Sequence, residues 1–143
     1  MKTRSIKKKE IESRWFLIDG SNIRLGKLAA KAAVVLMGKN DILKAENLDP
    51  MNNVVIINAE KIDLFPTKVK RKMYRRHSGF PGGFSERTYE QMMEKSPEKV
   101  VELAVKRMLP QNRMGDAIYK RLKVFKGAEH EFGAQKPVEV KVK

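Results

Sequence analysis

Residues 15–38, WFLIDGSNIRLGKLAAKAAVVLMG, decide the fold of this chain. The first four are apolar and lead into Asp-Gly, which is typical of a buried strand. Residues 20–22 have turn composition. Apolar side chains then recur at helical spacing, at Leu25, Leu28, Ala29, Ala32 and Leu36. Gly38 ends that pattern. The stretch therefore predicts a buried strand, a tight turn and a helix with one apolar face.

A second apolar run, residues 54–57 (VVII), follows a loop that contains Asp49-Pro50 and Asn52-Asn53. Two buried strands joined by a helix are typical of a parallel βαβ unit. We therefore expect an α/β fold with a parallel sheet.

Local signals outside this unit predict several shorter elements. Residues 70–77 are expected to form a more exposed strand, and Thr88 with Gln91 resembles a capping box that opens a short helix. Ser96-Pro97 is typical of a helix start, and Pro110 ends that helix. A last helix is expected over residues 115–122, followed by a short strand at residues 124 and 125.

The length of 143 residues suits a single compact domain. We expect a basic N-terminal arm over residues 1–14, one α/β domain over residues 15–126 and a C-terminal extension over residues 127–143. There is no cysteine, which excludes disulfides, cysteine-based zinc sites and a thiol nucleophile. The longest apolar run, residues 32–37, is far shorter than the ~18 residues of a membrane-spanning helix, and the N-terminus lacks the apolar stretch of a secretory signal.

Charge is the strongest compositional feature. The chain carries 31 Lys and Arg against 17 Asp and Glu, for a formal net charge of +14. Such an excess repels itself unless a polyanion neutralises it, and it is the usual footprint of nucleic-acid binding. A soluble basic protein without a nucleic-acid partner, or one drawn to an anionic membrane surface, would also fit the charge alone.

The most basic stretch lies between Asp63 and Glu86, where no acidic residue occurs. Six cations occupy nine positions there, with Tyr74 and His77 among them: Lys68, Lys70, Arg71, Lys72, Arg75 and Arg76. Arg and Lys suit phosphates, and the two ring side chains suit stacking on unpaired bases. The following loop, SGFPGG, contains Gly79, Gly82 and Gly83, which allow close backbone approach. We predict RNA binding here; the alternative is a solvated charged strand.

A second basic cluster lies near the end of the last predicted helix: Arg113, Lys120, Arg121, Lys123 and Lys126. Nucleic-acid phosphates would explain it. Cations at a helix C-terminus also complement the helix dipole, so part of this charge has a structural explanation.

The sequence offers little support for catalysis. Residues 20–27 follow a strand and precede a helix, but Ser21 and Leu28 stand where a Walker loop needs Gly and Ser or Thr. The two histidines, His77 and His130, have no partners at metal-ligand spacing. We expect no catalytic residue, metal or cofactor. A nuclease would need acidic metal ligands near its basic groove, and a DNA-binding regulator would need a recognition helix.

Five separated stretches, in this order, resemble the universal large-subunit ribosomal protein family thirteen in its bacterial form. They read DGSNIRLGKLAA (19–30), VVIINAEKI (54–62), MYRRHSGFPGG (73–83), SPEKVVELAVKRMLP (96–110) and YKRLKVFKGAEH (119–130). The resemblance runs from about residue 15 to residue 137. The family's Tyr-Arg-His-Ser-Gly region corresponds to residues 74–79, with Arg75 in place of a second aromatic residue. Arg107 replaces a glycine of the later signature, and residues 47–53 differ from the family's usual loop.

The resemblance implies a three-layer α/β/α fold with a small parallel sheet of about four strands. It implies a structural, non-enzymatic constituent of the large (50S) subunit in the cytoplasmic ribosome. Its partners would be the 23S rRNA and neighbouring large-subunit ribosomal proteins, with no membrane and no small-molecule substrate. Members of this family act early in subunit assembly, and some bind messenger RNA and restrain translation.

Overall fold

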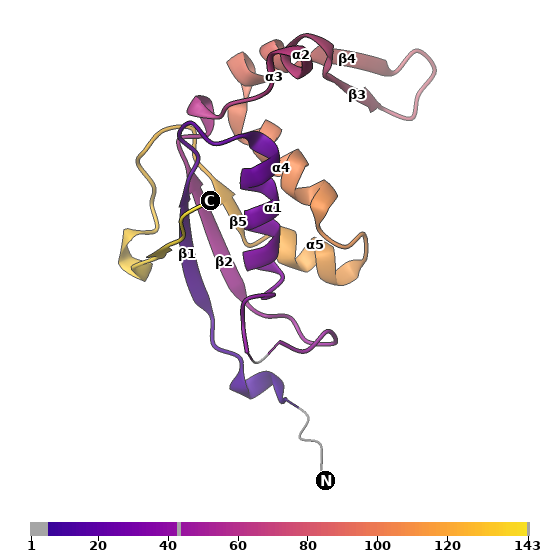
Figure 1. Cartoon of the computed structure of the whole chain (residues 1–143). Coiled ribbons are helices and arrows are strands. Elements are labelled where there is room, and N and C mark those ends of the chain that lie inside the picture. The colour runs from indigo at the N-terminus through magenta and orange to yellow at the C-terminus, as the bar shows by residue number, and fades with distance from the viewer. Residues whose placement is uncertain (1–5, 43, 143) are drawn as a thin grey trace.

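The structure is a computed structural model that describes residues 6–42 and 44–142 (Figure 1). Residues 1–5 of the predicted basic arm therefore lie outside the described residues. The rest of that stretch contains a short 3-10 helix, η1 (Lys8–Glu10), and leads into the first strand.

Four parallel strands form the central sheet: β1 (Arg14–Asp19), β2 (Asn52–Ile57), β5 (Leu122–Val124) and β6 (Val138–Glu139). Their order is β5-β2-β1-β6. Helix α1 (Leu25–Leu36) connects β1 with β2, which pair in a register that places Phe16 opposite Val54. The predicted α/β class, the parallel βαβ unit and the small sheet of about four strands are confirmed.

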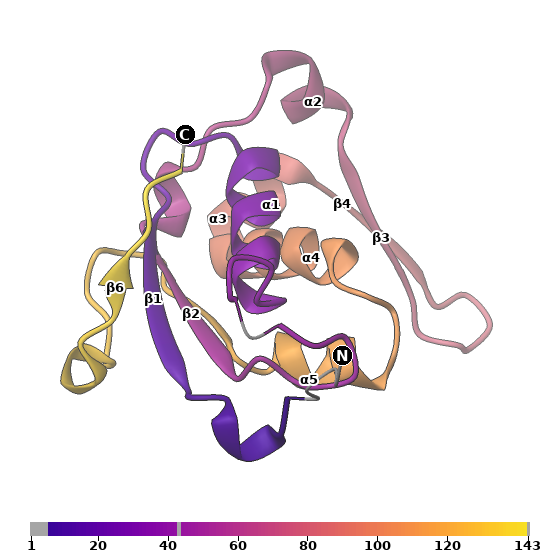
Figure 2. The ribbon, with the colours of Figure 1, turned by 60° about the horizontal axis from the view of Figure 1, so that its bottom comes forward.

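The main core lies between one face of this sheet and two helices, α1 and α4 (Pro97–Met108) (Figure 2). Alternate strand residues point to that face, and Ile18, Val54 and Ile56 are fully buried there. Each such side chain contributes about 1.5–3 kcal/mol by leaving water. Gly38 ends α1 with a φ of +63°, a conformation that favours glycine.

The opposite face carries the C-terminal segment, which includes the 3-10 helix η3 (Gly133–Gln135) (Figure 2). Trp15 of β1 stacks on Phe132, with ring centroids 4.9 Å apart, and Phe125 meets Phe132 edge-on at 6.0 Å. The segment then returns to the sheet, where the Val140 N–H donates to the Leu17 carbonyl at 2.8 Å. The residues after 126 therefore lie along the sheet and add its edge strand.

A two-stranded antiparallel hairpin, β3 (Met73–His77) and β4 (Phe84–Thr88), projects from this body (Figure 1). The predicted strand over residues 70–77 was wrong in its start, because residues 66–71 form a helix, α2 (Pro66–Arg71). Pro66 occupies the first helical position, which its fixed φ favours. Strand β4 was not predicted, since residues 84–88 lack an apolar alternation.

The remaining helices begin largely as predicted. Thr88 and Gln91 form the predicted capping box of α3 (Tyr89–Lys95), and Ser96 precedes Pro97 at the start of α4. The bounds of the last helix were wrong: α5 (Arg113–Tyr119) begins where the Asn112 side chain accepts from the Gly115 N–H at 2.9 Å. Leu122 is buried as the first residue of β5 and does not extend the helix. None of the helices in the described ranges is long and apolar enough to cross a bilayer.

Candidate nucleic-acid interface

A cleft of about 450 Å³ lies between the β3–β4 hairpin and the side of α4, and we name it the hairpin cleft. Five cationic side chains and one carboxylate, Glu102, contribute to its lining. The cations are Arg75 and Arg76 of β3, Arg87 of β4, and Lys99 and Arg107 of α4. This arrangement concentrates positive charge around a concave surface, where it attracts a polyanion most strongly.

Tyr74 lines the same cleft, and its hydroxyl oxygen is buried without a hydrogen-bond partner among the described residues. Burial, with a smaller effect of Tyr89, raises the pKa of Tyr74 to about 12. The hydroxyl therefore keeps its proton at neutral pH and is a potential donor. The ring packs against the core, and the Lys72 ammonium lies 5.3 Å from its centroid. This placement favours a hydrogen-bonding role for Tyr74 over the predicted stacking on bases.

The structure divides the first predicted cluster among three places. Lys68, Lys70 and Arg71 lie in the last turn of α2, while Arg75 and Arg76 lie on β3. Lys72 lies between these elements and is half-buried; burial, followed by Arg107 and Lys68, lowers its pKa. The cations are thus spread from α2 along β3 and do not form one continuous row.

Strand pairing gives Arg75 an acidic partner that the gap between Asp63 and Glu86 does not reveal. Arg75 lies opposite Glu86 in the hairpin register, and its Nε is 2.7 Å from Glu86 Oε1. Both side chains are partly exposed, so this pair contributes little to stability. It does reduce the positive charge that Arg75 presents. Arg76 is exposed, with Ser85 opposite it in the register.

The loop of the hairpin contains the other predicted residues. His77 ends β3, and its Nδ1 accepts a hydrogen bond from the Gly79 N–H at 2.9 Å. Gly79 and Gly82 both have positive φ angles, of 88° and 72°. Gly83 completes the loop, in which the Ser78 N–H donates to the Gly83 carbonyl at 3.0 Å.

The second predicted cluster also divides. Arg113, Lys120, Lys123 and Lys126 are exposed. Arg121 is half-buried and pairs through two nitrogens with the Asp49 carboxylate. Burial alone would raise the pKa of Asp49, but hydrogen bonds from Arg121 and the Met51 N–H outweigh it and lower that pKa. Arg121 therefore joins the loop before β2 to the start of β5, a structural role that the sequence did not reveal.

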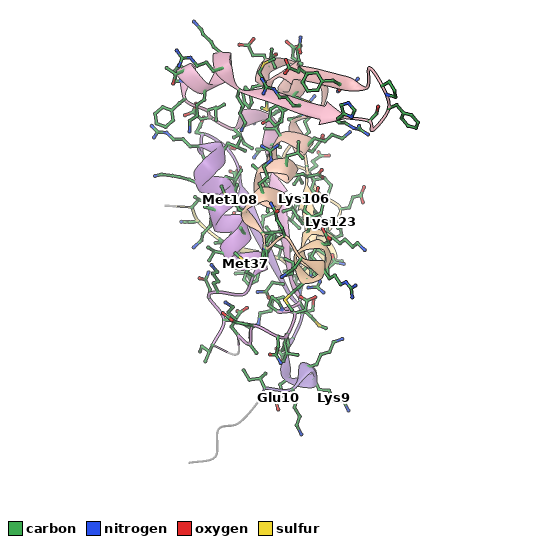
Figure 3. All side chains as sticks on the ribbon, turned by 90° about the vertical axis from the view of Figure 1, so that its right-hand side faces the viewer. Lys9, Glu10, Met37, Lys106, Met108 and Lys123 are labelled. Atoms are coloured by element: carbon green, nitrogen blue, oxygen red, sulfur yellow. The ribbon has the colours of Figure 1, made fainter. Side chains whose placement is uncertain are left out.

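The exposed cations extend below the hairpin. Figure 3 shows Lys106 on α4 and Lys123 on β5 beneath it. The Lys106 ammonium lies 5.2 Å from the centroid of the Tyr119 ring. Tyr119 also lines the hairpin cleft, and its hydroxyl lies 3.4 Å from Glu102 Oε2. Lys106 therefore lies near one edge of the cleft, through its contact with Tyr119.

Arg87, Lys99 and Arg107 were not predicted as binding residues. Arg87 follows Glu86, Lys99 follows Glu98 and Arg107 follows Lys106, all outside the basic run of residues 68–76. Only the tertiary structure brings the three to one cleft. A signal was present for two of them: Lys99 and Arg107 are two helical turns apart, which places them on one side of α4.

No group of three or more His, Asp or Glu side chains within the described ranges could hold a metal ion. Asp19, at the carboxyl end of β1, instead accepts hydrogen bonds from the Ser21 N–H at 3.0 Å and from Asn58 Nδ2 at 2.8 Å. These bonds tie the end of β1 to the turn that follows it and to the end of β2.

Comparison with known proteins gives a consistent result. A family model described as "Ribosomal protein L13" matches residues 13–131. A relative from Thermosipho africanus is 48% identical over 139 residues, which cover 97% of this chain and 93% of the relative. Relatives from Aquifex aeolicus and Salinispora arenicola are each 46% identical over 143 residues, all of this chain and 99% and 97% of theirs. All three carry the name "Large ribosomal subunit protein uL13".

Proposed function

Because this chain belongs to the ribosomal protein L13 family, we propose that its hairpin cleft and the surrounding cations bind the rRNA of the large subunit. Membership makes the chain a structural constituent of the large ribosomal subunit and not an enzyme. The proposal concerns how that constituent attaches to RNA, and through which residues.

The observation that carries the proposal is the composition of the cleft. Arg76, Arg87, Lys99 and Arg107 are all exposed, and each lines the cleft without a salt-bridge partner among the pairs that the described residues form. Like charges held together repel one another, so a bound polyanion would lower the free energy of this arrangement. Guanidinium groups bind phosphate oxygens with two parallel hydrogen bonds, which suits a sugar–phosphate chain that passes through the cleft.

The buried Tyr74 hydroxyl adds a second argument. An unsatisfied buried polar group costs about 1–3 kcal/mol, and a phosphate oxygen or ribose hydroxyl in the cleft could satisfy it after a small shift of the ring. Recognition would then depend largely on the shape and backbone of the RNA, because the major groove of an RNA helix is too deep and narrow for side chains to read.

The cations outside the cleft would extend the same interface. Lys68, Lys70 and Arg71 on α2 would lie on one side of it, and Arg113, Lys120, Lys123 and Lys126 on the other. We assign Arg121 to the Asp49 pair instead, where its contribution to RNA binding would be indirect.

The test compares two variants that each lose four positive charges. One changes Arg76, Arg87, Lys99 and Arg107 to Gln; the control changes Lys39, Lys44, Lys136 and Lys141, which are exposed elsewhere, to Gln. If the intact protein neutralises roughly six phosphates, log affinity falls with log salt at a slope near −5. We expect the cleft variant to flatten that slope by roughly 3 for a large-subunit rRNA fragment, and the control to leave it nearly unchanged. Equal slopes in the two variants would exclude the cleft from the interface.

A role in early subunit assembly, contacts with neighbouring ribosomal proteins and repression through messenger RNA follow from the family resemblance and stay predictions. Phosphate contacts carry no sequence information, so the same surface could hold rRNA or messenger RNA. Competition between folded rRNA and duplex DNA would test the remaining alternative, a DNA-binding regulator. Displacement of the rRNA by an equal concentration of DNA would favour that alternative.

A further inference from the structure

The tip of the hairpin presents two large aromatic side chains to solvent. Phe80 is 74% exposed and Phe84 is 57% exposed, and neither belongs to the hydrophobic core cluster. Aromatic surface that stays in water contributes little to folding, so two such rings at one projecting tip suggest a binding role. Figure 1 shows that this turn lies at the far end of the hairpin from α3 and α4.

The turn that carries Phe80 and leads into Phe84, the first residue of β4, has a defined geometry. Pro81 and Gly82 form the centre of a β-turn in which the Gly83 N–H donates to the Phe80 carbonyl at 2.9 Å. Gly82 has a φ of +72°, as the third residue of a type II turn requires. A Cβ at Gly83 would lie 1.9 Å from Ser78 Oγ and 2.9 Å from the Phe80 carbonyl oxygen, so the loop closes tightly on itself. The rings are therefore held by a preorganised support.

The surroundings of the tip indicate which kind of partner it meets. Phe84 lies opposite His77 in the register, and Arg76 is the next residue along β3. The only acidic residue between residues 73 and 88 is Glu86, and it pairs with Arg75. A hydrophobic pocket on another protein would not need these cations, whereas a polyanion with flat, apolar faces would need both features.

We propose, on the basis of the RNA-binding function above, that Phe80 and Phe84 stack on unpaired bases of the RNA. The cations of the hairpin hold the phosphates, and the two rings take bases that have left the helical stack. Stacking is available only to bases in loops, bulges and single strands, because paired bases already stack on one another. The tip therefore directs the protein to unpaired segments next to a helix.

The experiment measures the affinity of the full chain for two labelled probes by fluorescence anisotropy. One probe is a short single-stranded oligoadenylate, and the other is a blunt RNA duplex without unpaired bases. The variant Phe80→Ala with Phe84→Ala removes both rings and no charge. The control, Ile42→Ala with Met108→Ala, removes two exposed apolar side chains elsewhere. Far-ultraviolet circular dichroism and a thermal melt establish that each variant folds.

Loss of one base–aromatic stack costs roughly 5- to 150-fold in affinity. We expect the Phe variant to bind oligoadenylate at least tenfold more weakly, with the same salt slope, and to bind the duplex as the intact protein does. The control should bind both probes normally. A second variant, Phe80→Tyr with Phe84→Tyr, keeps the aromatic faces and should retain the affinity for oligoadenylate.

Two results would overturn the inference. If the Phe→Ala variant binds oligoadenylate within twofold of the intact protein, or loses the same factor for both probes, the rings do not stack on unpaired bases. That failure leaves the RNA-binding function intact, because the intact protein still binds the duplex. If the intact protein binds neither probe in dilute salt, the proposed function and this inference both fail.

Discussion

The sheet with its two covering helices, which we call the body, differs from the β3–β4 hairpin in how far its residues are buried. Four of the six residues of β2 are buried, whereas eight of the ten hairpin strand residues are exposed. Burial fixes the residues of the body, because each position must fill a defined space. The hairpin makes few such contacts, and isolated two-stranded hairpins are marginally stable. Its side chains are therefore available to contact a partner. We expect substitutions in the sheet and its helices to affect stability, and substitutions in the hairpin to affect binding.

The largest expected effect tests the body. Ile56→Ala removes a fully buried side chain from the centre of the sheet, and we expect the free energy of unfolding to fall by about 2–5 kcal/mol. Arg76→Ala, an exposed change in the hairpin, should shift it by about 0.5 kcal/mol or less. Urea denaturation of both variants measures this difference. Equal losses would mean that the hairpin is part of the folding core and would break the comparison.

The Asp49–Arg121 pair tests whether a cation of the body has a structural role. The folded state lowers the pKa of Asp49, so the pair stabilises the protein above the ordinary carboxyl pKa, and this stability is lost as the pH falls through the lowered value. We expect Asp49→Asn to cost about 1–3 kcal/mol at pH 7. Urea denaturation along a pH series should show the difference from the intact protein shrinking in acid. A difference that stays constant down to the acid limit would contradict this role.

Thr88 lies where the hairpin meets the body, because it ends β4 and caps α3. Thr88→Ala removes the side-chain oxygen that accepts from the Gln91 N–H at 3.3 Å, and we expect a loss of about 1 kcal/mol. Thr88→Ser keeps the hydroxyl and should recover most of it. The thermal midpoints of the two variants check this, and equal midpoints would show that the capping box does not stabilise the fold.

The smallest expected effect comes from replacing a glycine in the body, Gly26, compared with a glycine in the hairpin, Gly82. Gly26 lies in α1 with no atom within 4 Å of an added Cβ, so Gly26→Ala should stabilise the protein by about 0.5–1 kcal/mol. Gly82→Ala in the hairpin turn meets open space too, but its φ of +72° strains any Cβ. Because the hairpin makes few contacts with the rest of the fold, we expect this strain to open the turn locally. Gly82→Ala should therefore weaken RNA binding while the thermal midpoint changes little. A fall in the midpoint of Gly26→Ala would show that α1 does not accept a Cβ at this position.

The difference in burial between the body and the hairpin also explains which elements could be predicted from the sequence. The apolar runs of β1 and β2 and the spacing in α1 follow from burial, so the parallel unit could be predicted. The capping box was predicted from Thr88 and Gln91, and the family from five stretches that resemble it. The hairpin lacks that signal: β4 carries Ser85, Glu86 and Arg87 on an exposed strand, and propensity alone does not identify it. The C-terminal edge strand, only two residues long, was also beyond sequence patterns.

The candidate site was predicted in part for a related reason. A run of cations is visible in sequence, so Arg76 was predicted to bind together with the cations of α2. Contacts made by pairing and folding are not visible: the Arg75–Glu86 pair needs the hairpin register, and the Arg121–Asp49 pair joins residues 72 positions apart. Arg87, Lys99 and Arg107 reach the cleft only through the tertiary structure.

Hydrogen–deuterium exchange, measured with and without saturating large-subunit rRNA, tests the central claim most directly because it reports on both regions in one experiment. We expect peptides covering β3, the loop and β4 to exchange quickly in the free protein and much more slowly when the RNA binds. Peptides from β1 and β2 should be protected in both states. RNA that binds while leaving exchange in the hairpin unchanged would contradict the account.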